Sequence, residues 1–289
     1  MRADLQALVC TKIKGYGKQA MTKMRLDVLL VEKGIFPSRE QARTAIMSRR
    51  VSADGKIIDK AGTQVSPEAV IAVSGEEPPF VSRGGLKLAK ALQSFRLDMR
   101  GVVMADIGAS TGGFTDCALQ NGAARVYAVD VGYGQLAWKL RRDERVVVLE
   151  KTNARYLTAE QIPELLDIIT IDASFISLGK LLPALFPLLK ASGLLVALIK
   201  PQFEAGREKV GKKGVVRDPA VHLEVIEGVL AAAADSGFVP RGLDFSPIKG
   251  PEGNIEYLLL LAKQGEPAEL DAAAVVAASA AALGKTADK

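Results

Sequence analysis

Six short apolar runs, separated by stretches long enough to form helices, constrain the fold of this chain more than any other feature. The longest helical stretch between them covers residues 218–236. Near-continuous apolar strands that alternate with helices are typical of a parallel sheet with helices on both faces. The sequence therefore predicts an α/β fold with a doubly wound, Rossmann-like sheet, whose ligands bind beyond the carboxyl ends of the strands. The predicted strands are 102–106, 125–130, 145–150, 167–172, 194–200 and 255–262.

The stretch MADIGASTGGFTD, residues 104–116, joins the first predicted strand to a helix. A dinucleotide-binding turn would read G-x-G-x-x-G, but Ser110 stands where its middle glycine would be, which argues against NAD and a dehydrogenase. S-adenosylmethionine has no phosphate, and its ribose diol can bind a carboxylate such as that of Asp130. The alternative that Asp106 and Asp130 only cap helices stays open. The residues predicted to bind S-adenosylmethionine are Asp106, Gly108, Ser110, Gly112, Gly113, Phe114, Asp130 and Asn153.

Four charged residues lie where such a sheet presents side chains to a ligand. Lys87 is in a helix before the first strand, and Asp172 ends the fourth strand. Lys200 ends the fifth strand and Glu256 begins the last. A lysine buried at a strand end needs an acidic partner, and two acids are available. Ordinary exposed strand-end charges would explain each residue alone, but they explain all four beside a cofactor turn poorly.

Residues 24–73 have a different pattern. The apolar spacing in RLDVLLVEKG and a capping-box signature at Ser38 and Gln41 predict two helices, and Asp54-Gly55 predicts a tight hairpin turn. Residues 1–60 hold 13 Lys and Arg against 6 Asp and Glu, whereas the rest of the chain holds 25 against 27. Such asymmetry favours a module that binds a polyanion such as nucleic acid. A solvated helix face is the alternative explanation of its arginines.

Composition also predicts the limits of the domains. A break rich in Gly, Pro and Glu follows the small module, and the tail is rich in alanine and is expected to form a loose helix with a frayed end. The apolar segment 181–199 contains two prolines, a lysine and a glycine, so it predicts a helix, a glycine turn and a strand rather than a membrane span. The predicted parts are a basic extension at 1–23, the module at 24–73, a linker at 74–82, the sheet domain at 83–264 and the tail at 265–289.

Two resemblances to known families follow from quoted motifs. Residues 24–72 resemble the small RNA-binding domain first described in ribosomal protein S-four, through RLDVLLVEKGIFPSREQARTAIMSRRVSADGKII. That resemblance implies that the second helix and the following turn face RNA, with phosphate contacts from Arg39, Arg43, Arg49 and Arg50. Residues 81–262 are similar to FtsJ-type RNA ribose 2'-O-methyltransferases, whose catalytic set is Lys, Asp, Lys, Glu. The motifs SRGGLKLAKAL, IDASF, LIKPQFE and NIEYLLLL place this set at Lys87, Asp172, Lys200 and Glu256.

The combination of these two domains with VSRGGLKL, DIGASTGGFTD and KPQFEAGR is characteristic of the TlyA family and covers about residues 24–263. Ser110-Thr111 and Pro201 depart from the broader FtsJ pattern and fit the TlyA subgroup. The resemblance implies a cytoplasmic enzyme that uses S-adenosylmethionine to methylate a cytidine ribose in the RNA of the small ribosomal subunit, the large one or both, with no metal and no membrane. In this mechanism Lys200 acts on the proton of the ribose hydroxyl.

Further RNA contacts are expected near these catalytic residues. The loop 206–218 carries five Lys and Arg between glycines, directly after the predicted catalytic lysine, and Lys212 and Lys213 are its central cations. Arg83, in the motif around Lys87, is expected to contact RNA as well. Two alternatives to an RNA methyltransferase stay open besides the dehydrogenase. One is an RNA-binding assembly factor with a vestigial cofactor site, and the other is a membrane-lytic protein of the haemolysin type.

Overall fold

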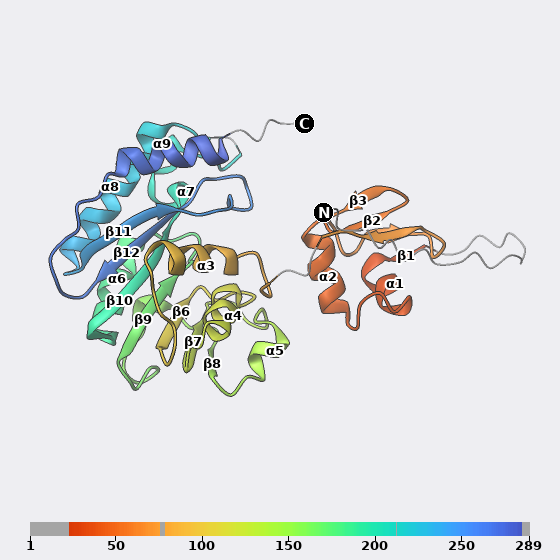
Figure 1. Ribbon diagram of the computed structural model, residues 1–289, viewed down its shortest axis with the longest axis horizontal. Coiled ribbons are helices and arrows are strands. Elements are labelled where there is room, and N and C mark those ends of the chain that lie inside the picture. Colours follow the sequence, from red (N-terminus) through yellow and green to blue (C-terminus); the bar gives the residue numbers. More distant parts are fainter. Residues whose placement is uncertain (1–22, 76–78, 212, 285–289) are drawn as a thin grey trace, which may run out of the picture. The chain divides into compact units, whose positions relative to one another are not determined.

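The computed structural model describes residues 23–75, 79–211 and 213–284 (Figure 1). The chain divides into two compact units, residues 1–77 and 78–289. The basic extension expected at 1–23 lies outside the described residues except for its last residue, and so does Lys212.

The smaller unit packs two short helices against two small antiparallel sheets. Leu26, Leu30 and Ile46 are completely buried where the helices meet, because the apolar positions of each helix fall on one face. One sheet pairs β1 with β4, and the other has the order β3-β2-β5. The elements are β1 Met24–Arg25, α1 Leu26–Glu32, α2 Arg39–Met47, β2 Val51–Ala53, β3 Lys56–Ile58, β4 Gln64–Val65 and β5 Ile71–Val73.

The local signals read from the sequence of this unit are confirmed. Ser38 Oγ accepts a hydrogen bond from the backbone N–H of Gln41 at 3.3 Å and so caps α2. Asp54 and Gly55 have φ values of 51° and 78° and connect the antiparallel strands β2 and β3. A two-residue hairpin turn with both φ values positive matches the twist of its strands, and aspartate and glycine tolerate that conformation best.

The larger unit contains a seven-stranded sheet in its described residues, in the order β11-β12-β10-β9-β6-β7-β8. The strands β10, β9, β6, β7 and β8 are parallel neighbours, as the apolar runs predict. Each predicted strand matches an observed one. The strands are β6 Val103–Ile107, β7 Arg125–Val129, β8 Val146–Leu149, β9 Leu166–Ile171, β10 Leu189–Ile199, β11 Val239–Phe245 and β12 Tyr257–Ala262.

Helices cover both faces of this sheet, so the doubly wound fold is confirmed (Figure 1). One apolar core lies under α3, α4 and α5, and the other lies under α6, α8 and α9. The helices are α3 Gly85–Ser94, α4 Gly113–Gln120, α5 Trp138–Arg141, α6 Leu182–Leu185, α7 Pro201–Glu204, α8 Pro219–Asp235 and α9 Ala272–Leu283. Short 3-10 turns are η1 Ala154–Tyr156, η2 Leu178–Lys180, η3 Phe186–Leu188 and η4 Arg207–Lys209.

The sheet differs from the prediction of parallel strands at one end. Strand β12 runs antiparallel to both of its neighbours, β10 and β11. Strand β11 itself was not predicted, because its sequence VPRGLDF mixes polar and apolar residues, as suits a partly exposed edge strand. The reversal has a consequence for the site: the first residues of β12 lie at the same edge of the sheet as the last residues of β10.

The apolar segment 181–199 folds differently from the predicted helix, glycine turn and strand. Its helix is short and gives way to a 3-10 turn at Pro187, where a continuing helix would lose a hydrogen bond. Strand β10 then begins at Leu189, before Gly193, and a register shift between Leu189 and Leu194 absorbs the irregular residues. No helix in the described part of the chain is both long and apolar enough to cross a membrane.

The alanine-rich tail is more ordered than expected. Helix α9 begins at the N-cap Asp271, whose side chain accepts a hydrogen bond from the backbone N–H of Ala274. It packs on α8 and β11, and Val276 and Ser279 are buried there. The expectation of a loose helix is therefore wrong for residues 272–283, because small alanine side chains let the helix lie close to its neighbours.

Candidate active site at the carboxyl edge of the sheet

Four charged side chains converge where the parallel strands end. Lys87 Nζ lies 2.7 Å from Glu256 Oε2 and 3.5 Å from Asp172 Oδ2. Lys200 Nζ lies 2.6 Å from Asp172 Oδ1, so Asp172 stands between the two lysines. The structure thus brings together all four residues predicted from the sequence to be catalytic, although they come from α3 and from the ends of three strands. We refer to Lys87, Asp172, Lys200 and Glu256 as the tetrad.

The tetrad is largely shielded from water. The exposed side-chain fractions are 7% for Lys87, 8% for Lys200, 17% for Asp172 and 1% for Glu256. Two cations and two anions balance one another, as a buried site requires, because an unpaired buried charge is costly. Within the described residues, Asp172 Oδ1 and both carboxylate oxygens of Glu256 accept no well-directed hydrogen bond, although Asp172 Oδ1 and Glu256 Oε2 each form an ion pair. Such acceptors are typical of sites that act on a ligand.

Lys200 is held at the end of β10 by its surroundings. Besides the Asp172 carboxylate, its Nζ donates to the Asp172 carbonyl oxygen at 3.3 Å and to Ser174 Oγ at 3.1 Å. These acceptors match the three N–H bonds of an ammonium group. Pro201 follows at the first position of α7, where its fixed φ suits the start of a helix and ends the strand.

Glu256 reaches the tetrad because β12 is reversed. In an all-parallel sheet, the residue before a strand would lie at the opposite edge from Lys200. The Glu256 carbonyl accepts a hydrogen bond from the Ser246 backbone N–H at 2.9 Å, which ties the start of β12 to the end of β11. A Cβ atom on Gly250 would lie 2.6 Å from Glu256 Oε1, so only glycine lets this loop approach the carboxylate.

The glycines of the turn 108–113 are required by packing. Gly108 has φ 84°, and a Cβ atom there would lie 2.8 Å from the carbonyl oxygen of Asp172. Gly112 has φ 95°, and its Cβ would lie 2.3 Å from Leu140 Cδ1. A Cβ on Gly113 would lie 2.3 Å from Ser82 Oγ. The turn is therefore pressed against the end of β9 on one side and against α3 on the other, which places it beside the tetrad.

Asp130 and Asn153 lie at the ends of the next strands and bind backbone groups. Asp130 Oδ2 accepts from the N–H of Ser110 at 2.8 Å, and Oδ1 accepts from the N–H of Gly132 at 2.7 Å. Ser110 is exposed and has φ 48°. Asn153 is exposed and caps η1 through a hydrogen bond from the N–H of Arg155. Both predicted cofactor residues thus face the same edge of the sheet as the turn.

Asp106 is 1% exposed and is surrounded by hydroxyl groups. It accepts hydrogen bonds from the N–H and Oγ1 of Thr115, at 3.0 and 2.7 Å, and from Thr170 Oγ1 at 3.2 Å. Burial, together with the negative charge of Asp172, raises the pKa of Asp106 to about 6, although the hydrogen bonds from Thr115 and Thr170 act in the opposite direction. Asp106 therefore joins the start of α4 to β9. Phe114, which is 4% exposed, packs into the apolar core under α3, α4 and α5.

The charges around the turn fit a cationic cofactor. Residues 106–116 contain acids but no lysine or arginine. A pyrophosphate would meet Asp130 and Asp172 here with no cation in the turn to balance it, while Asp106 is buried beneath the turn. S-adenosylmethionine carries positive charge at its sulfonium and amino groups, and its diol can donate to a carboxylate. The residues present therefore fit S-adenosylmethionine.

An exposed aromatic ring lies beside the tetrad and was not singled out from the sequence. Phe175 is 90% exposed, has φ 64° and follows β9 closely after Asp172. Its ring contacts that of Phe203 with the centroids 5.0 Å apart. At the same edge, Tyr133 is 72% exposed and Lys151 Nζ lies 4.7 Å from the centroid of its ring. No sequence periodicity marks these rings, because Phe175 and Tyr133 are single residues in loops and Phe203 lies in the four-residue helix α7.

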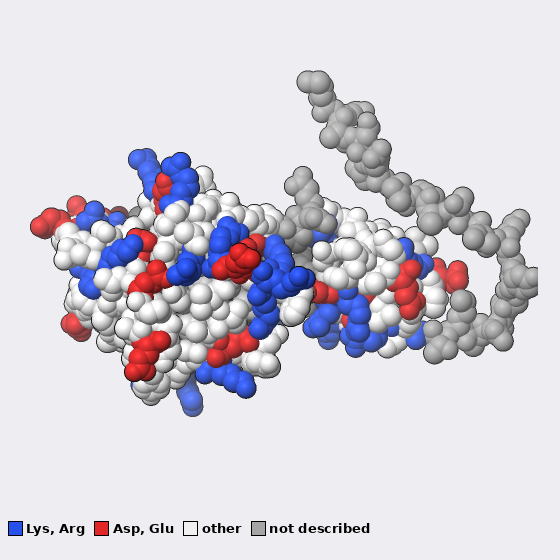
Figure 2. Space-filling view, turned by 90° about the horizontal axis from the view of Figure 1, so that it is seen from below, with Lys and Arg blue, Asp and Glu red and all other residues white. Residues whose placement is uncertain are grey.

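The arginines predicted to contact RNA fall into two groups. Arg39 donates to Asp27 at 2.9 Å, and Arg50 donates to the carbonyl oxygens of Ser74 and Gly75. Arg43 and Arg49 are exposed, and neither has an ion-pair partner among the described residues. Figure 2 shows Lys and Arg side chains gathered on one side of the smaller unit.

The loop 206–218, which we call the basic loop, follows α7 and leads into α8. Lys209 pairs with Glu224 of α8. Lys213 and Arg217 are exposed and line, with Lys209, a hollow of about 400 Å³. Arg83 is exposed just before α3, and Lys212 lies outside the described residues.

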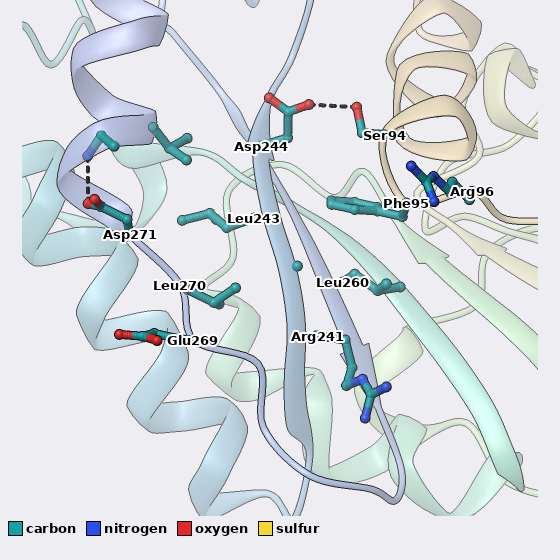
Figure 3. Close-up of a pocket in the computed structure, with 13 residues that line it drawn as sticks. Ser94, Phe95, Arg96, Arg241, Leu243, Asp244, Leu260, Glu269, Leu270 and Asp271 are labelled. Atoms are coloured by element: carbon teal, nitrogen blue, oxygen red, sulfur yellow. Dashed lines mark hydrogen bonds between the residues drawn. The ribbon is translucent and has the colours of Figure 1, made fainter.

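A second hollow lies away from the tetrad. It has a volume of about 510 Å³ and is enclosed by the end of α3, the edge strand β11 and the start of α9 (Figure 3). Figure 3 shows the Phe95 ring and the Leu243 and Leu270 side chains around it, with Asp244 bound to Ser94. No predicted site residue lines it. In the described ranges, no three His, Cys, Asp or Glu side chains are grouped in a way that could hold a metal ion.

Comparisons with known proteins agree with this geometry. The family model of FtsJ-like methyltransferases matches residues 80–263, and that of the S4 domain matches residues 24–71. The provisionally named rRNA methyltransferase YqxC of Bacillus subtilis is 54% identical over 86% of this chain and 88% of its own. The 16S/23S rRNA (cytidine-2'-O)-methyltransferase TlyA of Mycobacterium tuberculosis is 46% identical over 85% of this chain and 92% of its own.

A solved structure gives the same result for the fold. A protein of Streptococcus thermophilus described as a hemolysin is 47% identical, covers 92% of this chain and 98% of its own, and superposes with a TM-score of 0.73. The matched regions contain both the arginine-bearing helix α2 and every residue of the tetrad. This chain therefore belongs to the TlyA family, in which an S4 domain precedes an FtsJ-like methyltransferase domain.

Proposed function

We propose that this protein transfers the methyl group of S-adenosylmethionine to the 2'-hydroxyl of a cytidine ribose in ribosomal RNA. The observation that carries the proposal is the tetrad, an ion-paired and shielded group of two lysines and two acids directly beside the turn 108–113. The relatives support the substrate, because the M. tuberculosis protein is named for both the 16S and the 23S rRNA.

The chemistry requires little beyond orientation and control of one proton. The bound cofactor supplies a methyl group that its sulfonium already activates. A ribose 2'-hydroxyl is a weak nucleophile, so the protein must fix its position and polarise or remove its proton. Lys200 Nζ, between Asp172 Oδ1 and Ser174 Oγ, is placed to contact a hydroxyl that takes the place of Ser174. We assign Lys200 to act on the hydroxyl proton: as the neutral amine, with one N–H bond fewer, it would accept this proton while the methyl group bonds to the hydroxyl oxygen.

The other tetrad members would keep Lys200 in place. Asp172 balances its charge at 2.6 Å, and Lys87, itself paired with Glu256, holds Asp172 from the opposite side. The shielding of the group strengthens each of these contacts, because electrostatic interactions are stronger where water is excluded. Asp130 and the turn residues would hold the ribose and amino-acid ends of the cofactor, and Asn153 its adenine.

Ribosomal RNA would meet both units. Arg43 and Arg49 of the smaller unit are free to bind phosphates, and Arg39 and Arg50 border them. In the larger unit the RNA contacts would come from Arg83 and from Lys212 and Lys213 of the basic loop. An unstacked base fits the exposed Phe175 ring, because aromatic side chains are the usual platforms for single-stranded RNA bases. The RNA is that of the small subunit, the large subunit or both, and such a substrate places the protein in the cytoplasm.

The test is methyl transfer from labelled S-adenosylmethionine to purified, unmodified ribosomal subunits. We expect label in RNA with the wild type. With Lys200→Ala we expect the rate to fall about 1,000-fold, because general acid–base catalysis typically contributes about 100- to 10,000-fold. Binding of S-adenosylmethionine should persist in Lys200→Ala. Mapping of the labelled nucleoside identifies the subunit and the position.

The matched control is Lys190→Ala. Lys190 lies on the same strand, β10, but at its other end, where it pairs with Asp167 and is 43% exposed. This variant should retain wild-type transfer. The absence of label on either subunit, with S-adenosylmethionine still bound, would overturn the proposal in favour of an assembly factor or another RNA substrate.

A further inference from the structure

The basic loop is held at the backbone of one buried residue, Val216. The N–H of Val216 donates to Asn254 Oδ1 at 2.9 Å, and the carbonyl oxygen of Val216 lies 3.0 Å from His222 Nε2. Asn254 Nδ2 also donates to the carbonyl oxygen of Gly214 at 2.8 Å. Val216, Asn254 and His222 are at most 3% exposed. The loop that carries the exposed Lys213 and Arg217 is therefore anchored near its C-terminal end by side chains that bind both the N–H and the carbonyl group of one residue.

The histidine in this arrangement has a defined tautomer. A carbonyl oxygen can only accept, so Nε2 of His222 carries a proton, and in the neutral imidazole Nδ1 is then the acceptor. Nδ1 lies 2.7 Å from the hydroxyl oxygen of Tyr257, which therefore donates to it. Tyr257 is completely buried, and its ring meets the imidazole edge to face. The hydroxyl of Tyr257 thus fixes the orientation of the imidazole that holds the loop.

Asn254 and Tyr257 belong to the segment that carries Glu256, whereas His222 lies in α8. Asn254 comes two residues before Glu256, and Tyr257 comes directly after it. Tyr257 pairs in the sheet with Ile199, the residue before Lys200. A displacement of this segment would therefore move the loop anchors and Glu256 together, because the buried hydrogen bonds leave little freedom between them.

Helix α9 completes the arrangement from outside the FtsJ-like region. Ser279 Oγ lies 3.3 Å from the Tyr257 hydroxyl and donates to the carbonyl oxygen of Val276. The FtsJ-like match ends at residue 263, whereas α9 begins at Ala272. The C-terminal helix covers the tyrosine and keeps water from its hydroxyl.

We propose that Asn254, His222 and Tyr257 are positioning residues that hold the basic loop in register with the tetrad, so that an RNA phosphate bound by the loop fixes the ribose at Lys200. We call these three residues the Val216 clamp. This inference rests on the proposed function, because it takes RNA as the ligand of the loop. The exposed cations Lys213 and Arg217 supply the charge for a phosphate, and the clamp supplies the fixed position that a flexible, glycine-containing loop lacks.

The first test is Tyr257→Phe, which removes one hydroxyl and no ring volume. We expect the KM for ribosomal subunits to rise about fivefold, as the loss of one buried hydrogen bond implies, with the affinity for S-adenosylmethionine unchanged. The matched control is Tyr127→Phe, which removes the hydroxyl that donates to Glu164 at 2.7 Å on β7. The control should keep the wild-type KM, and an unchanged KM in Tyr257→Phe would overturn the proposal.

The second test separates positioning from a general loss of stability. Arg217→Ala is made in the wild type and in Tyr257→Phe, and subunit binding is measured directly over a range of salt. If the clamp positions the loop, Arg217→Ala weakens binding and lowers the salt slope in the wild type but changes little in Tyr257→Phe. Equal effects in both backgrounds would overturn the clamp. His222→Gln, which keeps a donor for the Val216 carbonyl, should also retain tighter binding than His222→Leu.

The outcomes distinguish this inference from the proposed function. Failure of the wild type to label any ribosomal RNA refutes the proposed function. The comparison of Arg217→Ala in the wild type and in Tyr257→Phe still tests the clamp in that case, because it measures subunit binding and not methyl transfer. Labelling by the wild type together with an unchanged KM in Tyr257→Phe refutes the clamp alone.

Discussion

The two units use their cations in opposite ways. In the smaller unit, Arg43 and Arg49 are exposed and lack an acidic partner among the described residues, and their neighbour Arg39 is 57% exposed. In the larger unit, Lys87 and Lys200 are at most 8% exposed, and each contacts a carboxylate. An exposed, unpaired cation can exchange water for phosphate at little cost, whereas a buried, paired one keeps a fixed place. Under the proposed function, the exposed cations would bind a polyanion and the buried cations would orient a reacting atom.

The two units also each contain a buried acid, and these acids differ in their partners. Asp27 is enclosed between Arg25 and Arg39, and the hydrogen bonds from Arg25 above all lower its pKa to about 2. Asp106, with hydroxyl and amide donors but no cation, has its pKa raised to about 6 by burial. Neighbouring cations keep the first acid charged, whereas burial favours the neutral form of the second.

Among the tests of this comparison, the largest effect is expected from breaking the shared acid of the tetrad. Asp172→Asn leaves Lys200 without a carboxylate, and we expect methyl transfer to fall at least about 100-fold, the lower end of a general acid–base contribution, with no change in the affinity for S-adenosylmethionine. Single-turnover rates on unmodified subunits measure it. The matched variant is Asp244→Asn, which removes the partner of Lys90 one turn along α3, where both side chains are partly exposed. The contrast tested here is between the shielded ion pairs of the tetrad and the partly exposed ion pair of Lys90 and Asp244. A wild-type rate in Asp172→Asn, or an equal loss in Asp244→Asn, would contradict it.

A smaller effect is expected when the exposed arginines are removed. Arg43→Ala combined with Arg49→Ala should weaken subunit binding about tenfold and reduce the slope of log affinity against log salt by roughly 0.7 for each single-strand phosphate that is no longer neutralised. The maximal rate at saturating RNA should stay at the wild-type value. Arg100→Ala is the control, because Arg100 is 83% exposed but paired with Asp98 in the larger unit. An unchanged salt slope in the double variant would show that Arg43 and Arg49 do not contact RNA phosphates.

Arg50 is less suited to binding an RNA phosphate than the sequence implies. Its guanidinium donates to the carbonyl oxygens of Ser74 and Gly75 and thereby holds the end of β5. If Arg50→Ala weakened RNA binding, the loss of a positive charge could not be separated from the loss of the hydrogen bonds that hold the end of β5. The charge pattern of a sequence shows where arginines are, but their partners depend on how the strands return, and only the fold supplies that information.

The strands were predictable because burial on both faces leaves a continuous apolar run, and six such runs match observed strands. Their direction was not predictable, since hydrophobicity has no polarity along the chain. The reversal of β12 is the most consequential example, because the predicted parallel sheet would have separated Glu256 from Lys200. The family motifs, and not the spacing, identified the tetrad members. The edge strand β11, the exposed Phe175 and the Val216 clamp have no sequence signature, since each depends on contacts between distant segments.

The smallest expected effect is a change in the unfolding free energy with pH, which compares Asp106 with Asp27. The raised pKa of Asp106 means that its stabilising contribution is complete below pH 3.8 and is lost as the pH rises through about 6. Between pH 5 and 7 the wild type should therefore lose about 1 kcal/mol of unfolding free energy relative to Asp106→Asn, which cannot ionise there. Urea unfolding of the two proteins at each pH measures this difference. Asp27 has the opposite sign: its contribution is present above pH 3.8 and is lost only as the pH falls through about 2. Asp27→Asn should therefore show no such change relative to the wild type between pH 5 and 7, and a pH-independent difference for Asp106→Asn would show that Asp106 stays charged throughout.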